Sequence, residues 1–198
     1  AMLSERGYHT LPLQERMRTN ETHKKRIAEA AAAMIRDGES LMLSSGSTSL
    51  HVAMALRERR NLLVLTNSLP VVSVLGGNPG IRLILLGGML EPESQYLYGD
   101  DTVSQLSRYR FDKLIFSGDG ISFSAGVTTW HLAEVEVNRR MFANCQQCIV
   151  VADHSKVGRA SLVGIDDLTQ VDRLVTDVEA DEQEVRQLQN RGIDVILV

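Results

Sequence analysis

The sequence predicts an α/β fold, with a mainly parallel sheet that carries helices on both faces. Strand-like and helix-like segments alternate along the 198 residues. The strand-like segments, such as residues 81–86, are continuous apolar runs, which is typical of strands buried on both faces. Small polar residues follow nearly every one of these runs, and the length suits one domain with a substantial core.

The individual elements follow from the hydrophobic pattern and from the residues that interrupt it. Residues 1–20 show no clear periodicity and are predicted to be a linker or arm, and residues 21–198 to form one domain. The first helix begins near Asn20 or Thr22, which suit an N-cap, and ends at Gly38. Further helices are expected to begin near residues 50 and 70 and to cover 102–108, 132–145 and 182–191. Strands are expected over 40–43, 61–65, 81–86, 113–116, 148–152, 173–176 and 193–198.

The charge of the chain argues against a domain that grips DNA by itself. The formal net charge is −4, whereas nucleic-acid-binding domains usually carry a basic face or stripe. The one short basic cluster, Lys24-Lys25-Arg26, is interpreted as a solvated helix face. We therefore expect this domain to bind nucleic acid poorly when alone.

The cysteines and the apolar runs indicate a cytoplasmic protein without a membrane partner. Cys145 and Cys148 have the C-x-x-C spacing of redox and metal motifs, but a structural zinc site needs four ligands. We expect one cysteine at a helix end and the other at a strand start, each as a small apolar residue. The apolar runs are too short to span a bilayer, and no secretion leader is expected. No cofactor, metal ion or catalytic residue is predicted.

Two strand-end segments have the composition of a phosphate site. Ser45, Gly46, Ser47 and Thr48 stand between a predicted strand and a helix, where backbone N–H groups and hydroxyls can point at an anion. Lys156 follows the buried strand that ends near residue 152, a natural position for a partner of a phosphate. Taken singly, the first segment is equally compatible with a Ser/Thr-rich helix cap, and the second with a solvated turn.

Other strand ends supply groups that suit sugar hydroxyls. Asp119 lies between two glycines just after a buried strand, and Glu134 belongs to the helix that follows residues 126–129. Asn67 and Gly88 follow two further strands. For Asp119 the alternative is an Asp-Gly turn, and for Glu134 a surface glutamate. For Asn67 it is a helix cap, and for Gly88 a plain turn. Ligands bind at the carboxyl ends of strands in an open parallel sheet, so the recurrence of such residues there favours a binding site.

These motifs, in this order, resemble the sensor domain of DeoR-type transcriptional regulators over about residues 18–177. The motifs are Ser44–Thr48, Thr66–Ser68, Gly87-Gly88, Gly99, Gly118–Ile121, Gly126–Thr129, Ala133–Val135 and Asp153–Lys156. The resemblance implies a fold similar to ribose-5-phosphate isomerase and glucosamine-6-phosphate deaminase. The family often has an acidic residue where this chain has Ser44.

The resemblance also implies a function and a set of partners. It implies the effector-sensing domain of a repressor of carbohydrate metabolism. Such a repressor binds operator DNA through an N-terminal winged helix-turn-helix and releases the DNA when it binds a sugar phosphate. Residues 45–48 and Lys156 would hold the phosphate, and Asn67, Gly88, Asp119 and Glu134 the sugar. A homodimer or homotetramer is expected.

Two observations from the residues bear on these implied properties. An apolar face of the first helix, with Ile27, Ala31 and Met34, is a candidate contributor to an oligomer interface. The alternative function is a sugar-phosphate isomerase or deaminase. This alternative is disfavoured because residues 117–122 hold a single acid, Asp119, and such chemistry needs a positioned acid and base.

Overall fold

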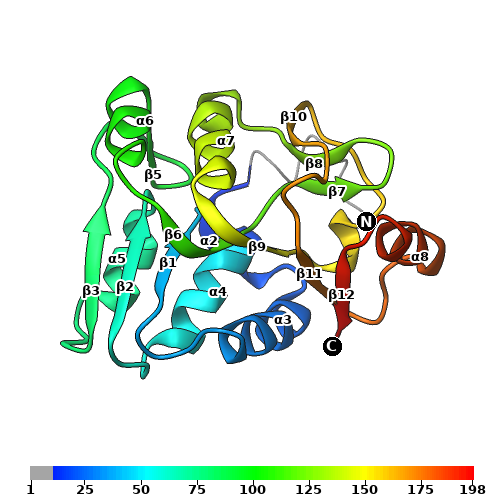
Figure 1. The fold of residues 1–198 in the computed structure, drawn as a ribbon, viewed down its shortest axis with the longest axis horizontal. Coiled ribbons are helices and arrows are strands. Elements are labelled where there is room, and N and C mark those ends of the chain that lie inside the picture. Colours follow the sequence, from blue (N-terminus) through cyan, green and yellow to red (C-terminus); the bar gives the residue numbers. More distant parts are fainter. Residues whose placement is uncertain (1–10) are drawn as a thin grey trace.

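The computed structural model describes residues 11–198 and contains a seven-stranded sheet in which every pair of neighbouring strands is parallel (Figure 1). The strand order is β12-β11-β9-β6-β1-β2-β3. The bounds are β1 Ser40–Leu43, β2 Leu62–Thr66, β3 Ile81–Leu85, β6 Phe111–Phe116, β9 Cys145–Val151, β11 Arg173–Thr176 and β12 Asp194–Leu197. The predicted α/β class is therefore confirmed.

The strands bury apolar side chains on both faces, which explains their continuous apolar sequences. In β1, Leu41 and Leu43 belong to one core cluster, and Met42 belongs to the cluster on the opposite face. The same alternation holds in β6, where Ile115 joins the first cluster and Leu114 the second. Since successive side chains of a strand point to opposite faces, such a sheet needs a helical layer on each side.

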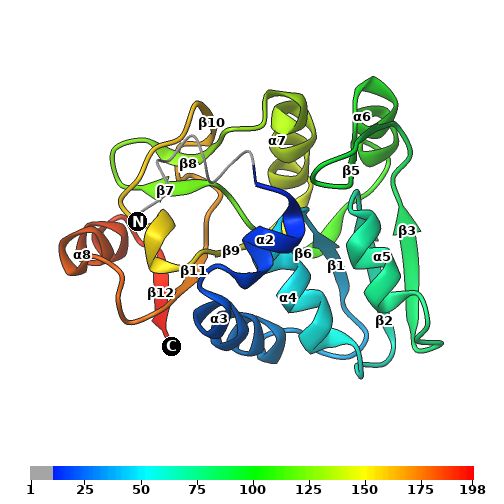
Figure 2. The same cartoon turned by 180° about the vertical axis from the view of Figure 1, so that it is seen from behind.

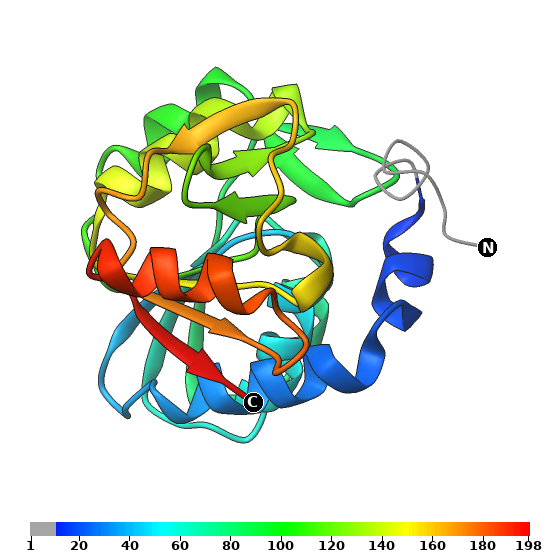
Figure 3. The ribbon, with the colours of Figure 1, turned by 90° about the vertical axis from the view of Figure 1, so that its right-hand side faces the viewer.

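The helices supply these two layers (Figures 2 and 3). Helices α2 (Leu13–Arg18), α3 (Glu21–Ala33), α4 (Ser47–Leu56) and α5 (Leu69–Leu75) contribute to the first cluster. Helices α6 (Asp100–Leu106), α7 (Val135–Ala143) and α8 (Glu182–Asn190) contribute to the second. Every helix within residues 11–198 is too short or too polar to span a bilayer.

Two small antiparallel sheets and two short 3₁₀ helices complete the fold and were not predicted. Strands β4 (Met89–Glu91) and β5 (Tyr96–Tyr98) form a hairpin, and β7 (Gly120–Ser122), β8 (Gly126–Thr129) and β10 (Val163–Asp166) form a second sheet over α7. The 3₁₀ helices are η1 (Leu132–Glu134) and η2 (His154–Lys156). The additional strands are three or four residues long, too short for a hydrophobic period to emerge.

The beginning of the chain differs most from the expectation. Part of the predicted arm is helix α2, which packs against α4, and residues 1–10 lie outside the described residues. Helix α3 begins after Asn20, as expected. Within its basic cluster Lys25 and Arg26 are exposed, as a solvated face requires, but Lys24 is 1% exposed. The apolar face proposed for oligomerisation is also covered, since Ile27 and Ala31 are buried inside this chain. That interpretation was wrong because the face packs on the chain's own sheet.

Most other boundaries agree within about three residues. Helix α4 begins at Ser47 rather than near residue 50, so the serine-rich segment forms its first turn. Strand β9 begins at Cys145 rather than Cys148, so both cysteines lie in one strand, not one at a helix end. Cys148 is fully buried, as expected of a small apolar residue.

We predict that Ile27→Ala lowers the free energy of unfolding by about 2–5 kcal/mol, because the substitution leaves a cavity under a fully buried side chain. Urea unfolding of both proteins measures this change. Glu29→Ala, at an exposed position of the same helix, is the matched control and should change stability by less than about 0.5 kcal/mol. Equal effects of the two substitutions would show that Ile27 does not pack in the core.

Candidate functional site

A strongly polar pocket lies at the carboxyl ends of three adjacent central strands. The segments after β1 and β6 contribute residues 45–48 and 117–119 to its lining, and the segment after β9 contributes Ala152, Asp153 and Lys156. The chain order reverses between β1 and β6, since β2 and β3 lie on one side of β1 while β6, β9, β11 and β12 lie on the other. Crevices of this kind at a reversal of strand order are the usual ligand sites of open α/β sheets.

The first turn of α4 forms one wall of the pocket. Gly46 has a φ of +107°, a conformation that favours glycine, and a Cβ there would approach Ser117 Oγ to 3.2 Å. Ser47 and Thr48 follow as the first helical residues and are buried. The first N–H groups of a helix have no partner within it and carry the positive end of its dipole. This wall is therefore suited to an anion.

Glu134 brings a buried carboxylate to the pocket. Its Oε1 accepts hydrogen bonds from Ser45 Oγ at 2.6 Å and from Asn67 Nδ2 at 3.0 Å. Burial raises the pKa of Glu134 to about 7, a direction that the nearby Asp119 reinforces, while the hydrogen bonds from Ser45 and Asn67 oppose it. Glu134 is thus a pocket residue and not the surface glutamate of the alternative interpretation.

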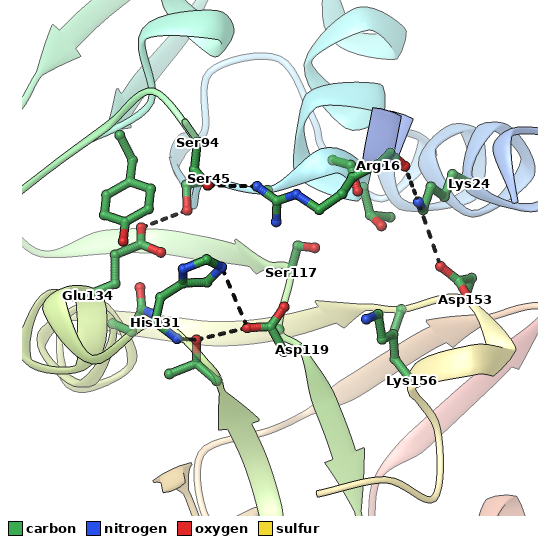
Figure 4. A pocket seen from close by; sticks show the side chains of 18 residues that line it. Arg16, Lys24, Ser45, Ser94, Ser117, Asp119, His131, Glu134, Asp153 and Lys156 are labelled. Atoms are coloured by element: carbon green, nitrogen blue, oxygen red, sulfur yellow. Dashed lines mark hydrogen bonds and ion pairs between the residues drawn. The ribbon is translucent and has the colours of Figure 1, made fainter. Parts of the chain in front are cut away.

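Asp119 is the second acidic group in the pocket (Figure 4). Its Oδ2 accepts hydrogen bonds from Thr129 Oγ1 at 3.0 Å and from the backbone N–H of Trp130 at 2.8 Å. His131 Nε2 lies 4.0 Å from the same oxygen. Strand β8 and the segment after it therefore hold the Asp119 carboxylate in place.

Three cationic side chains also line the pocket, and Figure 4 shows Arg16 extending across it from α2 while Lys156 points into it from η2. Arg16 is 5% exposed and donates from Nη2 to Ser94 Oγ at 2.8 Å, whereas its buried Nε has no hydrogen-bond partner among residues 11–198. Burial lowers the pKa of Lys156, and the carboxylates of Asp119 and Asp153 oppose this effect.

Lys24 joins this pocket to the beginning of the chain. Its Nζ donates to the backbone oxygens of Arg16 at 2.6 Å and Thr19 at 2.7 Å, and lies 3.9 Å from Asp153 Oδ2. Burial lowers the pKa of Lys24 to about 8, although Asp153 opposes the shift. Asp153 also accepts a hydrogen bond from Asn20 Nδ2 at 2.9 Å. Helices α2 and α3 are therefore fixed to the end of β9.

The structure brings together seven of the nine residues that the sequence singled out. The residues in the lining are Ser45, Gly46, Ser47, Thr48, Asp119, Glu134 and Lys156. Asn67 stands behind the lining and holds the Glu134 carboxylate.

Gly88 does not line the pocket, so the expectation that it does is wrong. A Cβ at Gly88 would lie 2.1 Å from Thr102 Oγ1 and 2.5 Å from the backbone oxygen of Tyr98. The glycine is required there for the close approach of β5 and α6. Ser44, which stands where the family often has an acid, is also outside the lining, and its hydroxyl lies 3.1 Å from Ser49 Oγ.

Sequence reasoning missed several lining residues, among them Arg16, Lys24, Ser94, Tyr96 and His131. Arg16 lies in a segment without periodicity, and Lys24 in a run of charges that looks solvated. Ser94 and Tyr96 belong to the unpredicted β4–β5 hairpin. The one available signal was the position of His131, two residues after the Gly126–Thr129 motif.

Comparison with known proteins agrees with this fold and with the order of the motifs. A family model described as "DeoR C terminal sensor domain" matches residues 19–178. The HTH-type transcriptional repressor GlcR of Bacillus subtilis (strain 168) is 34% identical over 92% of this chain and 70% of that protein. The glycerol-3-phosphate regulon repressor of Escherichia coli (strain K12) is 32% identical over 84% of this chain and 66% of that protein.

A solved structure shows the same fold at low sequence identity. Ribose 5-phosphate isomerase A of Methanocaldococcus jannaschii matches with a TM-score of 0.51 and 17% identity, over 69% of this chain and 54% of that one. The predicted similarity of fold is confirmed by this match. The family model covers most of the chain, and both repressors named above exceed 30% identity. The chain therefore belongs to the family of DeoR C-terminal sensor domains.

Proposed function

We propose that the pocket binds a phosphorylated sugar or a similar small phosphate ester, and that this binding regulates a transcriptional repressor of carbohydrate metabolism. The observation that carries the proposal is the buried guanidinium of Arg16, whose Nε has no hydrogen-bond partner among the described residues, in the same pocket as Lys156. A buried donor without a partner is costly, and an anionic ligand that accepts from it would remove that cost.

The neighbouring groups favour a phosphate monoester as the anion. The N-terminus of α4 adds backbone N–H groups and the hydroxyls of Ser47 and Thr48, which bind tetrahedral oxyanions in many proteins. Arginine adds a fork of donors that matches phosphate oxygens. One relative is named a glycerol-3-phosphate regulon repressor, and the presence of a phosphate ester in that name supports the same ligand class here.

The acidic side of the pocket favours a polyhydroxylated body for the ligand. Asp119 and Glu134 offer carboxylate oxygens, and His131 adds a ring nitrogen near Asp119. Carboxylates accept hydrogen bonds from hydroxyl groups, and the pocket has more polar than apolar lining residues. A sugar between the acids and the cations would satisfy both sets of groups.

The ligand would have to move side chains in order to enter. The cavity volume is about 30 Å³, measured as the space open to the centre of a water molecule. One water needs about 10–15 Å³ on this measure, so a sugar phosphate does not fit the present conformation. Arg16 crosses the pocket from α2, and its displacement would disturb the segment that leads toward the N-terminus. We propose that this segment transmits binding to a DNA-binding domain on its N-terminal side.

An enzymatic alternative rests on the raised pKa of Glu134, which the sequence did not give. Glu134 stands in the same pocket as Asp119, so two acids are present rather than one, and burial raises the pKa of Glu134 to about 7. An acid with such a pKa can act as a general base. The named relatives are transcriptional repressors, which supports a regulator rather than an isomerase or deaminase.

We predict that sugar monophosphates raise the melting temperature of this chain and that the same sugars without phosphate do not. A ligand at one hundred times its Kd stabilises the folded state by about 2.7 kcal/mol. Lys156→Ala should weaken sugar-phosphate binding about ten- to over a hundredfold, because it removes a charge-assisted contact. Thermal shift over a panel of paired compounds, followed by calorimetry, measures both effects.

Lys25→Ala is the matched control for Lys156→Ala, because Lys25 pairs with Glu21 on the outside of α3 and does not line the pocket. The affinity of the Lys25→Ala variant for the sugar monophosphate should equal that of the unchanged protein. A panel in which no monophosphate shifts the melting temperature would contradict the proposed ligand class. Equal affinities of the Lys156→Ala and Lys25→Ala variants would remove Lys156 from the phosphate site.

We predict that purified protein does not turn over ribose 5-phosphate or glucosamine 6-phosphate. Both Glu134 hydrogen bonds are made to one carboxylate oxygen by Ser45 and Asn67, which fix the group in a structural role. Product formation is measured by chromatography after incubation with excess enzyme. Conversion that disappears in Glu134→Gln would establish the enzymatic alternative instead.

We predict that the free energy of unfolding falls by about 2–3 kcal/mol between pH 5 and pH 8 because of Glu134. Its pKa is about 7 when folded and near 4.5 for an ordinary glutamate, so the folded state holds the proton more tightly. The stabilising contribution is therefore complete below pH 4.5 and is lost as the pH rises through 7. Chemical unfolding at several pH values measures the change.

Glu134→Gln removes this titration, so the fall in stability between pH 5 and pH 8 should be smaller by the same amount. The control is Glu136→Gln, two residues further along at an exposed position where the carboxylate pairs with Arg139. That variant should keep the pH dependence of the unchanged protein. If the Glu134→Gln and Glu136→Gln curves run parallel, the carboxyl of Glu134 titrates normally.

A further inference from the structure

Four side chains with metal-ligating atoms meet next to the pocket, although they are distant in the sequence. His23 comes from the first turns of α3, His154 from η2, and Asp177 and Glu179 follow β11. One ligand atom from each residue can be chosen so that all four atoms lie within 4.8 Å of one another. The cluster contributes nothing to the lining of the proposed effector pocket.

The two carboxylates lie near different ring nitrogens of the two histidines, Asp177 near Nδ1 and Glu179 near Nε2, at distances close to those between the ligands of one metal ion. Asp177 Oδ1 lies 3.4 Å from His23 Nδ1 and 2.9 Å from His154 Nδ1. The Glu179 carboxylate lies 3.5 Å from His23 Nε2 and 3.7 Å from His154 Nε2. Metal–ligand bonds of about 2.0–2.1 Å at tetrahedral angles place the ligand atoms about 3.3–3.4 Å apart. With one ring nitrogen from each histidine, the four ligand atoms span up to 4.8 Å, so side-chain movements, above all of the exposed Glu179, would be needed to bring them onto one ion.

We propose that His23, His154, Asp177 and Glu179 bind a divalent transition-metal ion, with Zn²⁺ as the best match. Two imidazoles and two carboxylates form a donor set that suits zinc, whereas Mg²⁺ and Ca²⁺ prefer oxygen ligands alone. The two carboxylates also give the cluster negative charge that a dication neutralises. The four ligands complete the coordination of a tetrahedral ion, so this site is structural or regulatory.

The burial of the cluster and its hydrogen bonds support this assignment. His23 Nδ1 is buried and makes no hydrogen bond within residues 11–198, although it points at a carboxylate. The Asp177 side chain is 0% exposed and is oriented by the backbone N–H groups of His154 at 2.8 Å and Glu179 at 3.1 Å. Such outer partners orient the ligands of metal sites. Glu179 is 60% exposed, which leaves a path from solvent.

A metal ion here would join two parts of the molecule that also meet at the pocket. It would tie α3 to η2, the short helix that carries Lys156 at its other end. The position of η2 relative to α3 already depends on the contact between Lys24 and Asp153. The bound ion would add a second connection between the same two elements and so reduce the motion of Lys156 relative to α3.

Zinc titration of the chelator-treated chain tests this proposal. We expect one Zn²⁺ per chain by calorimetry, and Co²⁺ in its place should give the visible absorption of a four-coordinate ion. His23→Gln and Glu179→Gln should each weaken Zn²⁺ binding about tenfold or more, since loss of even an outer partner of a ligand costs about 10–100-fold. Glu179 is largely exposed, so its variant reports on binding even if His23→Gln perturbs folding.

Two control variants separate this site from other groups that bind zinc. His51→Gln changes a histidine on α4 outside the cluster, and Cys145→Ser removes one thiol of the Cys145–Cys148 pair. Both should keep the affinity of the unchanged protein. Absence of Zn²⁺ binding, or Glu179→Gln and His23→Gln variants that bind as tightly as the unchanged chain, would overturn the proposal. Loss of binding in Cys145→Ser alone would place the ion at the thiols and overturn it as well.

Discussion

Glu134 carries an ionisable carboxyl that is almost completely removed from solvent, and the arrangement of the pocket depends on compensating it. A buried carboxylate is stable only when hydrogen-bond donors replace the water that it loses. Ser45 supplies one donor from the loop after β1, and Asn67 supplies the other from the loop after β2. Both loops are thereby fixed relative to η1, and the first turn of α4 is fixed with them. The geometry of the anion wall follows from the need to satisfy one acid.

The buried cations of the pocket also need partners that compensate their charge. Lys24 is almost fully buried, and two backbone oxygens together with Asp153 compensate its charge. Those oxygens belong to α2 and to the segment that joins α2 to α3, so the ammonium group holds α2 against the domain. Arg16 is then presented to the pocket as a consequence. Helix α2 is therefore part of the site because its backbone oxygens, and those of the segment after it, compensate the buried charge of Lys24.

The sequence predicted the central sheet well because each strand is buried on both faces, and this produces apolar runs that a single chain reveals. Seven of the predicted site residues do lie in the lining, and the reason is related, since topology alone places the ends of parallel strands together. The sequence failed where structure depends on contacts between distant segments. Lys24 looks solvated until α2 covers it, and the β4–β5 hairpin that brings Ser94 is too short to show a period. Gly88 was assigned to the wrong role because close backbone packing and ligand contact both require a glycine.

The single carboxylate of Asp153 interacts with two positively charged side chains. Lys24 and Lys156 both interact with it, and Asn20, the residue in the left-handed conformation at the junction of α2 and α3, occupies one of its oxygens. The two lysines therefore share the Asp153 carboxylate, and Lys156 has Asp119 as a second acidic neighbour. If Lys156 moves away from Asp153, the interaction between Asp153 and Lys24 becomes stronger. If Lys24 moves away, the interaction between Asp153 and Lys156 becomes stronger. If a ligand in the pocket moves Lys156, thermodynamic reciprocity requires that ligand and the attachment of α2 to influence each other equally in both directions.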